Sequence, residues 1–192
     1  MTDDKLFGER RQALEDNFFR KEEERALSAL KQKKAREEAL RDLGKITGVS
    51  DPNVIKQLVD LGVTVETAAA LSLVPPVLVA WADGQCDEKE RAAVMEAARQ
   101  AGIADESAAH SLLQGWLSTQ PPAELEQTWA AYFDALASRL PEKDAQALGS
   151  ELLARAKKVA EISGGILGLF ERVSRAEQSV LHALEKVLLA RR

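Results

Sequence analysis

Three acidic residues around a single glycine are the chain's candidates for a cation site. Asp83 and Gly84 follow an apolar segment, and Asp87 and Glu90 come shortly after them. A hard divalent ion such as Ca²⁺ or Mg²⁺ takes several oxygen ligands, which carboxylates, backbone carbonyls and water can supply. A tight turn at Gly84 would let carbonyls join the three carboxylates. The spacing is not that of an EF-hand, because a twelve-residue loop counted from Asp83 would end on Val94.

The same residues also have the spacing of helix-end signals. Asp87 and Glu90 match a capping box, in which each side chain accepts a hydrogen bond from the other residue's backbone amide. Asp83 would then end the preceding helix and accept from amides of the turn. Both interpretations, a Ca²⁺ or Mg²⁺ site and a helix stop followed by a cap, remain open at this point.

The other reactive side chains give little support for catalysis. Cys86 is the one cysteine, which excludes an intrachain disulfide and a cysteine zinc site, and its acidic neighbours should raise the pKa of the thiol. His110 and His182 belong to no spaced ligand cluster. The 163–165 Ser-Gly-Gly loop lacks the preceding strand and the Gly-Lys-Ser/Thr that make a phosphate loop specific. We therefore predict no catalytic residues, no enzyme activity and no firm cofactor.

Composition predicts helices and limits the partners. Of the 192 residues 30% are charged and 5% are aromatic, and Ala, Leu, Glu, Lys and Arg dominate, which favours helix over sheet. The net charge of −5 argues against general nucleic-acid binding. No secretory signal is visible, and the apolar run over 68–82 is too short to span a membrane. We expect a cytoplasmic protein and leave peripheral membrane association open.

Residues 1–45 differ from the rest of the chain. About half of them are charged, with Lys and Arg nearly balancing Asp and Glu, and apolar residues recur at roughly helical spacing between the charges. A continuous helix over 6–43 would be about 55 Å long, more than a compact domain needs. Such a helix is either a solvated one supported by ion pairs or a protein-binding arm. The candidate partner-binding residues are Phe7, Leu14, Phe18 and Phe19.

Residues 46–192 read as a compact all-α bundle of about six to eight helices, to which the long charged N-terminal helical arm is joined. No sustained alternation of apolar and polar residues suggests a strand. The tryptophans Trp81, Trp116 and Trp129 lie on apolar faces and should fill the core. The predicted helices begin at Asp51-Pro52, Thr64, Asp87, Asp105, Pro121-Pro122, about Asp144 and Ser174, with the second one kinked or broken at Pro75-Pro76. Ser174 and Glu177 have the spacing of a second capping box.

The segment around the acidic residues resembles the TerB-like (tellurite-resistance protein B-like) helical family. The matching residues are Ala80, Ala82, Asp83, Gly84, Asp87 and Glu90. The resemblance covers roughly residues 50–190 and is specific near 71–103. It implies a compact helical domain linked to bacterial stress responses or membrane-associated complexes, and a divalent cation held by clustered acids. The second half of the chain departs from that pattern, with Ser163 and a glycine-rich insertion in place of acids.

The N-terminus shows a shorter resemblance to the zeta subunit, the alphaproteobacterial inhibitor of ATP synthase. It rests on Phe7, Arg10, Ala13-Leu14-Glu15, Phe18 and Glu22-Glu23. The leading hypothesis is a non-enzymatic interaction or sensor module whose N-terminal helix binds a protein partner. The alternatives are a helical regulator of a rotary ATPase and a cation-dependent hydrolase centred on Asp83, Asp87 and Glu90. The partner and the oligomeric state are not predicted.

Overall fold

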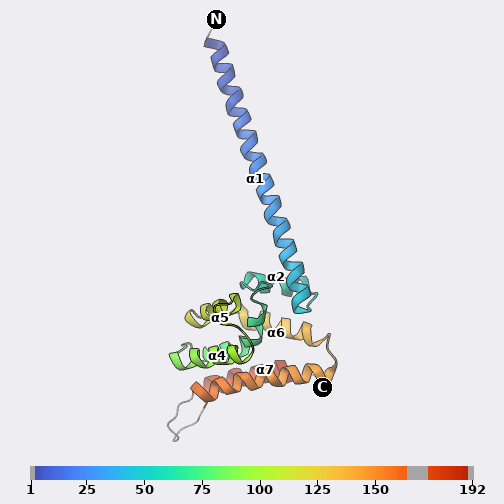
Figure 1. Ribbon diagram of the computed structural model, residues 1–192, viewed down its shortest axis with the longest axis vertical. Coiled ribbons are helices and arrows are strands. Elements are labelled where there is room, and N and C mark those ends of the chain that lie inside the picture. Colours follow the sequence, from blue (N-terminus) through green and yellow to red (C-terminus); the bar gives the residue numbers. More distant parts are fainter. Residues whose placement is uncertain (1–2, 164–172, 190–192) are drawn as a thin grey trace. The chain divides into compact units, whose positions relative to one another are not determined.

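The fold is all-α, as predicted (Figure 1). The computed structural model describes residues 3–163 and 173–189, with side chains from Arg20 onward, and contains no strand in these ranges. None of the helices found there is long and apolar enough to cross a membrane. The elements are α1 (Asp3–Thr47), α2 (Pro52–Asp60), the 3₁₀ helix η1 (Ala68–Leu73), α3 (Val74–Ala80), α4 (Glu88–Gln100), α5 (Ala108–Ser118), α6 (Glu124–Ala137), α7 (Glu142–Ser163) and α8 (Arg175–Leu189).

The chain divides into two units, Met1–Arg41 and Asp42–Arg192. The boundary falls within α1, four residues before the end of the predicted arm at residue 45. Its position has a packing reason, because the last turn of α1 carries Leu43, which is completely buried. The Thr47 hydroxyl, also buried, donates to the Leu43 carbonyl at 2.7 Å and stabilises the end of the helix.

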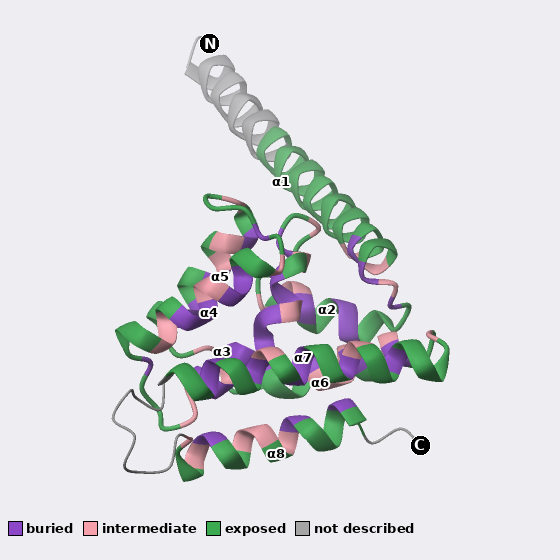
Figure 2. Ribbon diagram, turned by 60° about the horizontal axis from the view of Figure 1, so that its bottom comes forward, coloured by how far each residue is buried: buried purple, intermediate pink, exposed green. Residues whose placement is uncertain are grey.

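Helix α3 forms the centre of the second unit. Six of its seven residues are buried, and it contacts α4, α5, α6, α7 and α8 (Figure 2). A helix that is apolar on all sides has no face to offer to water and must be covered all round. The surrounding helices cover this short element and have buried apolar residues of their own, such as Val94 and Ala98 in α4 or Val159 and Ala160 in α7.

The prolines Pro75 and Pro76 begin α3 instead of interrupting a longer helix. They lie in the first turn, where the missing amide protons would have no helical acceptor. The prediction of a helix starting at Thr64 was wrong for a separate reason, which lies in the contacts of Thr64 itself. The Thr64 amide donates to the hydroxyl oxygen of Thr67 at 2.7 Å in a turn, and the 3₁₀ helix η1 begins only at Ala68.

Two other helix starts test the predicted signals. Asp51 caps α2 as predicted, its Oδ1 accepting from the Asn53 amide at 2.8 Å. The start of α5 at Asp105 was wrong, because Glu106 has a φ of +63°, which cannot continue a right-handed helix. Ser107 caps α5 instead by accepting from the His110 amide at 3.1 Å.

Helices α7 and α8 pack closely together at Gly149. A Cβ atom at this position would lie 2.4 Å from the carbonyl oxygen of Leu188, a backbone atom that cannot rotate away. The absence of a side chain at residue 149 therefore sets the distance between the two helices. Gly115, on α5, offers a contrast, since no heavy atom lies within 4 Å of a Cβ built there.

Gly149→Ala should destabilise the protein and Gly115→Ala should stabilise it. The first substitution forces α7 and α8 apart and should cost about 1–3 kcal/mol of unfolding free energy. The second replaces an exposed helical glycine and should add roughly 0.5–1 kcal/mol. Urea unfolding followed by far-UV circular dichroism measures both. Stabilisation by both substitutions would show that the two helices do not meet at residue 149.

Candidate functional site

The predicted site is the turn that connects α3 to α4. The Gly84 amide donates to the Trp81 carbonyl at 2.9 Å, and Gly84 has a φ of +84°. This left-handed conformation, and not crowding, is what requires glycine, because a Cβ at this position would meet nothing within 4 Å. Asp83 Oδ1 accepts from the Gln85 amide at 2.9 Å, so its carboxylate helps to hold the turn.

Asp87 and Glu90 form the predicted capping box. Asp87 Oδ1 accepts from the Glu90 amide at 2.8 Å, and Glu90 Oε2 accepts from the Asp87 amide at 2.7 Å. These two bonds satisfy amides at the start of α4 that have no partner within the helix. The capping interpretation is therefore confirmed.

The three candidate cation ligands, Asp83, Asp87 and Glu90, each accept a hydrogen bond from a backbone amide of the same turn. Within the described ranges no group of three or more His, Cys, Asp or Glu side chains is arranged to hold a metal ion. The observed geometry is that of a turn and a helix cap, and it offers no support for the Ca²⁺ or Mg²⁺ site.

The Glu90 carboxyl has a pKa above its ordinary value. Partial burial is the largest cause, and the carboxylates of Asp87, Asp83 and Glu177 add repulsion that the hydrogen bond from the Asp87 amide offsets in part. Glu177 is buried and belongs to the second predicted capping box. Its Oε2 accepts from the Ser174 amide at 2.7 Å, and Ser174 Oγ accepts from the Glu177 amide at 3.2 Å. The acids of the two capping boxes are thus close enough to repel one another.

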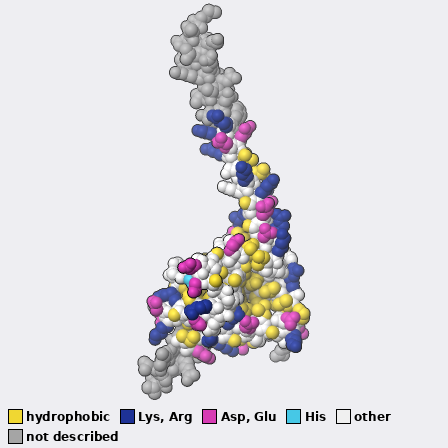
Figure 3. Space-filling view, in the orientation of Figure 1, with side chains coloured by type: hydrophobic (Ala, Val, Ile, Leu, Met, Phe, Trp, Pro, Cys, Tyr) yellow, Lys and Arg dark blue, Asp and Glu magenta, His cyan; other side chains and the backbone are white. Residues whose placement is uncertain are grey.

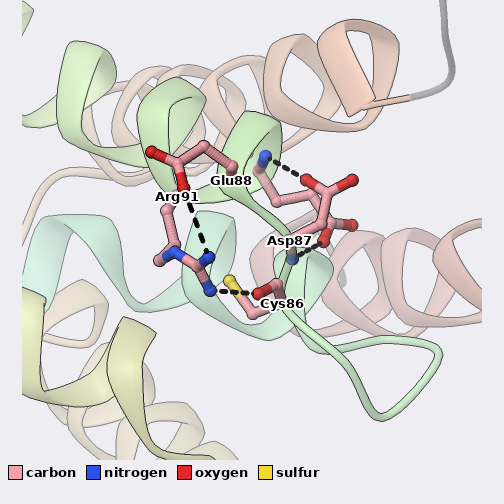
Figure 4. A network of polar contacts seen from close by, with 5 residues as sticks. Cys86, Asp87, Glu88 and Arg91 are labelled. Carbon is pink, nitrogen blue, oxygen red and sulfur yellow. Dashed lines mark hydrogen bonds and ion pairs between the residues drawn. The ribbon is translucent and has the colours of Figure 1, made fainter.

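Cys86 is buried beside this cap, with only 8% of its surface exposed. Arg91 Nη1 donates to the Cys86 carbonyl oxygen, and Arg91 Nη2 lies 3.7 Å from Glu88 Oε2 (Figure 4). Burial, followed by the nearby charge of Glu90, raises the thiol pKa to about 11, although Arg91 acts in the opposite direction. The predicted rise is confirmed, and burial contributes more to it than the acidic neighbours on which the prediction rested.

The tryptophans make packing contacts and also long-range hydrogen bonds that the sequence did not reveal. Trp129 is 1% exposed, stacks on Phe133 with ring centroids 5.8 Å apart, and donates from Nε1 to the Leu71 carbonyl at 2.8 Å. Trp81 is only half-buried, and its Nε1 donates to the carbonyl of the buried Trp116 at 2.8 Å. Both bonds join segments distant in sequence, so no local pattern could have shown them.

The sequence did not predict that the side chains of His110 and Asp105 lie close together. His110 Nε2 lies 3.6 Å from Asp105 Oδ1, five residues earlier. His182 is an exposed residue of α8. The glycines of the 163–165 loop, discussed above as a phosphate site, lie outside the described residues.

A cavity of about 220 Å³ between α6 and α8 was also not predicted. It is lined by Ala123, Glu126, Gln127, Trp129, Ala130, Ala183, Leu184 and Val187. Only Glu126 and Gln127 are polar, and the cavity contains none of the acids near Gly84. Its shape depends on how two helices some fifty residues apart in sequence pack, which helical periodicity does not determine.

The second candidate site is the arm. Phe7, Leu14, Phe18 and Phe19 belong to α1, but their side chains lie outside the described residues, so their role stays a prediction. From Arg20 to Ala39 every residue is exposed. Within this stretch Leu27 and Leu30 are each 53% exposed.

Comparison with protein-family models, curated proteins and solved structures finds no match to this chain. The TerB-like and zeta-subunit resemblances therefore stay predictions that rest on the residues that carry them.

Cys86 should react slowly with iodoacetamide while the protein is folded. A thiol pKa of about 11 instead of 9.0 leaves about a hundredfold fewer thiolates at pH 8, and burial blocks the reagent further. Mass spectrometry of the alkylated protein, with and without urea, measures the rates. Equal rates in the two conditions would contradict the buried position of this thiol.

Glu90→Gln should remove part of the pH dependence of stability. Because the folded pKa of Glu90 exceeds its unfolded value near 4.5, wild-type stability falls as the pH rises from the unfolded value through the folded one. Glutamine keeps the acceptor for the Asp87 amide without the charge. The variant should therefore gain stability relative to wild type across this window and keep the gain at pH 7.

Glu90→Ala is the matched control, since it removes the acceptor as well as the charge. It should destabilise the protein at low pH by roughly 0.5–1.5 kcal/mol, the net value of one hydrogen bond. Urea unfolding between pH 4 and pH 8 compares the three proteins. If Glu90→Gln lowers the free energy of unfolding at pH 7 as much as Glu90→Ala does, the charged carboxylate of Glu90 stabilises the folded protein and the prediction is wrong.

Proposed function

We propose that this chain is a non-enzymatic interaction module in which residues 20–41 of α1 form the binding arm. The observation that carries the proposal is the unbroken exposure of α1 from Arg20 to Ala39. Helices of globular proteins ordinarily bury one face, and a helix that buries none either stands in water or meets another molecule. Two leucines at 53% exposure within this stretch favour the second role.

The second unit suits a supporting role in such a module. Its core is built around α3, and the acids near Gly84 hold a turn and a helix cap through backbone amides. The TerB-like resemblance supports placing the module in a bacterial stress-response or membrane-associated complex. That assignment depends on the residues between Ala80 and Glu90 alone.

Photo-crosslinking in the native cells tests the role of the arm. One variant of the full chain carries p-benzoylphenylalanine in place of Leu27. The matched control carries it in place of Ile162 on α7, an aliphatic residue with a similar exposure of 45%. The Leu27 variant should give a discrete crosslinked product and the Ile162 variant should not, while both keep the wild-type thermal unfolding midpoint. Products from Ile162 alone, or from neither variant, would overturn the proposal.

A further inference from the structure

One face of the exposed part of α1 carries a regular series of residues. Intervals of three and four alternate along it, and such spacing keeps side chains on a single stripe of a helix. Each residue of the stripe is exposed. In order, the stripe consists of Arg20, Glu23, Leu27, Leu30, Lys34, Glu37 and Arg41.

The charges on this stripe are opposite in sign at equal distances from its centre. Leu27 and Leu30 flank the midpoint between Ser28 and Ala29. The next residue outward is Glu23 on one side and Lys34 on the other, and beyond them come Arg20 and Glu37. Figure 3 shows basic and acidic groups following one another along this part of the helix.

We propose that the arm binds the arm of a second copy of this chain in an antiparallel pair centred between Ser28 and Ala29. The inference rests on the proposed binding role of the arm and names its partner. In this arrangement Leu27 packs against the partner's Leu30, Glu23 faces the partner's Lys34, and Arg20 faces the partner's Glu37. The two-fold axis makes each of these contacts twice.

Charge selects the antiparallel orientation. A parallel pair in register would place Glu23 against the partner's Glu23 and Lys34 against the partner's Lys34. Like charges directly opposite each other are unfavourable, whereas the antiparallel pair converts the same residues into ion pairs. The leucines remain in contact in either orientation, so the charged residues decide between them.

The association should be weak and sensitive to salt. Only two leucines per chain become buried on association, and each ion pair at an exposed helix surface contributes little to the free energy of binding. Sedimentation equilibrium of the full chain should show an average mass near 21.0 kDa at low micromolar concentration. The mass should rise toward twice that value at several hundred micromolar, and about 1 M salt should suppress the rise because it screens exposed charges.

A charge exchange tests the pairing. Glu23→Lys alone sets two lysines against each other at both ends of the pair, and Lys34→Glu alone sets two glutamates, so each variant should remain monomeric. An equal mixture of the two variants restores opposite charges at both ends and should associate as strongly as wild type. Glu22→Lys combined with Arg25→Glu reverses two charges away from the stripe and keeps the ion pair between these residues, so this variant should associate like wild type.

Cysteine crosslinking tests the orientation. Variants with Glu23→Cys and Lys34→Cys, mixed and oxidised, should form a disulfide between the two different chains in preference to disulfides between identical ones. Preferred disulfides between identical chains would indicate a parallel pair and overturn the proposal.

A full chain that stays monomeric at all concentrations would also overturn the proposal. The crosslinking at Leu27 described above separates that result from a failure of the interaction role itself. A product with a different protein would retain the binding arm and remove only the second copy as its partner.

Discussion

The burial of every residue of α3 except Leu78 is the constraint on which the second unit depends. This seven-residue helix is too short to be stable alone and has no polar face to expose. It persists because five longer helices and η1 surround it, and each of them buries its own apolar face in doing so. The bond from Trp129 Nε1 to the Leu71 carbonyl satisfies a buried polar group just before α3 begins. Packing around one central element therefore determines where the other helices lie.

The chemistry at the end of α3 follows from this burial. A buried helix must end abruptly if the chain is to reach the surface, and Gly84 with its positive φ makes the turn. Asp83 and the capping box of Asp87 and Glu90 then satisfy the amides that the turn leaves open. These side chains resemble a ligand cluster because helix caps and cation sites use the same carboxylate oxygens. Partial burial is the main reason that the pKa of Glu90 is raised, and the neighbouring carboxylates add a smaller repulsion.

Sequence reasoning succeeded where the decisive interaction is local. The capping boxes at Asp87 and Ser174 join residues three apart, and both were predicted. It failed at Thr64 and Asp105, because such residues favour turns as well as helix starts and neighbouring backbone angles decide between them. The cavity between α6 and α8 depends on contacts between distant segments, and no periodicity in the sequence specifies them.

The exposed part of α1 is governed by different forces from those of the second unit. No buried face stabilises it, so its helicity must come from residues of high helix propensity and from pairs such as Arg25 with Glu22, 2.9 Å apart. Its last turn supplies a fixed end through the buried Leu43, which removes much of the cost of starting a helix. These interactions within the helix stabilise it, but they do not make any one of its faces a better binding surface than another. With so few apolar residues on any one face, a partner must recognise this segment mainly by the order of its charges.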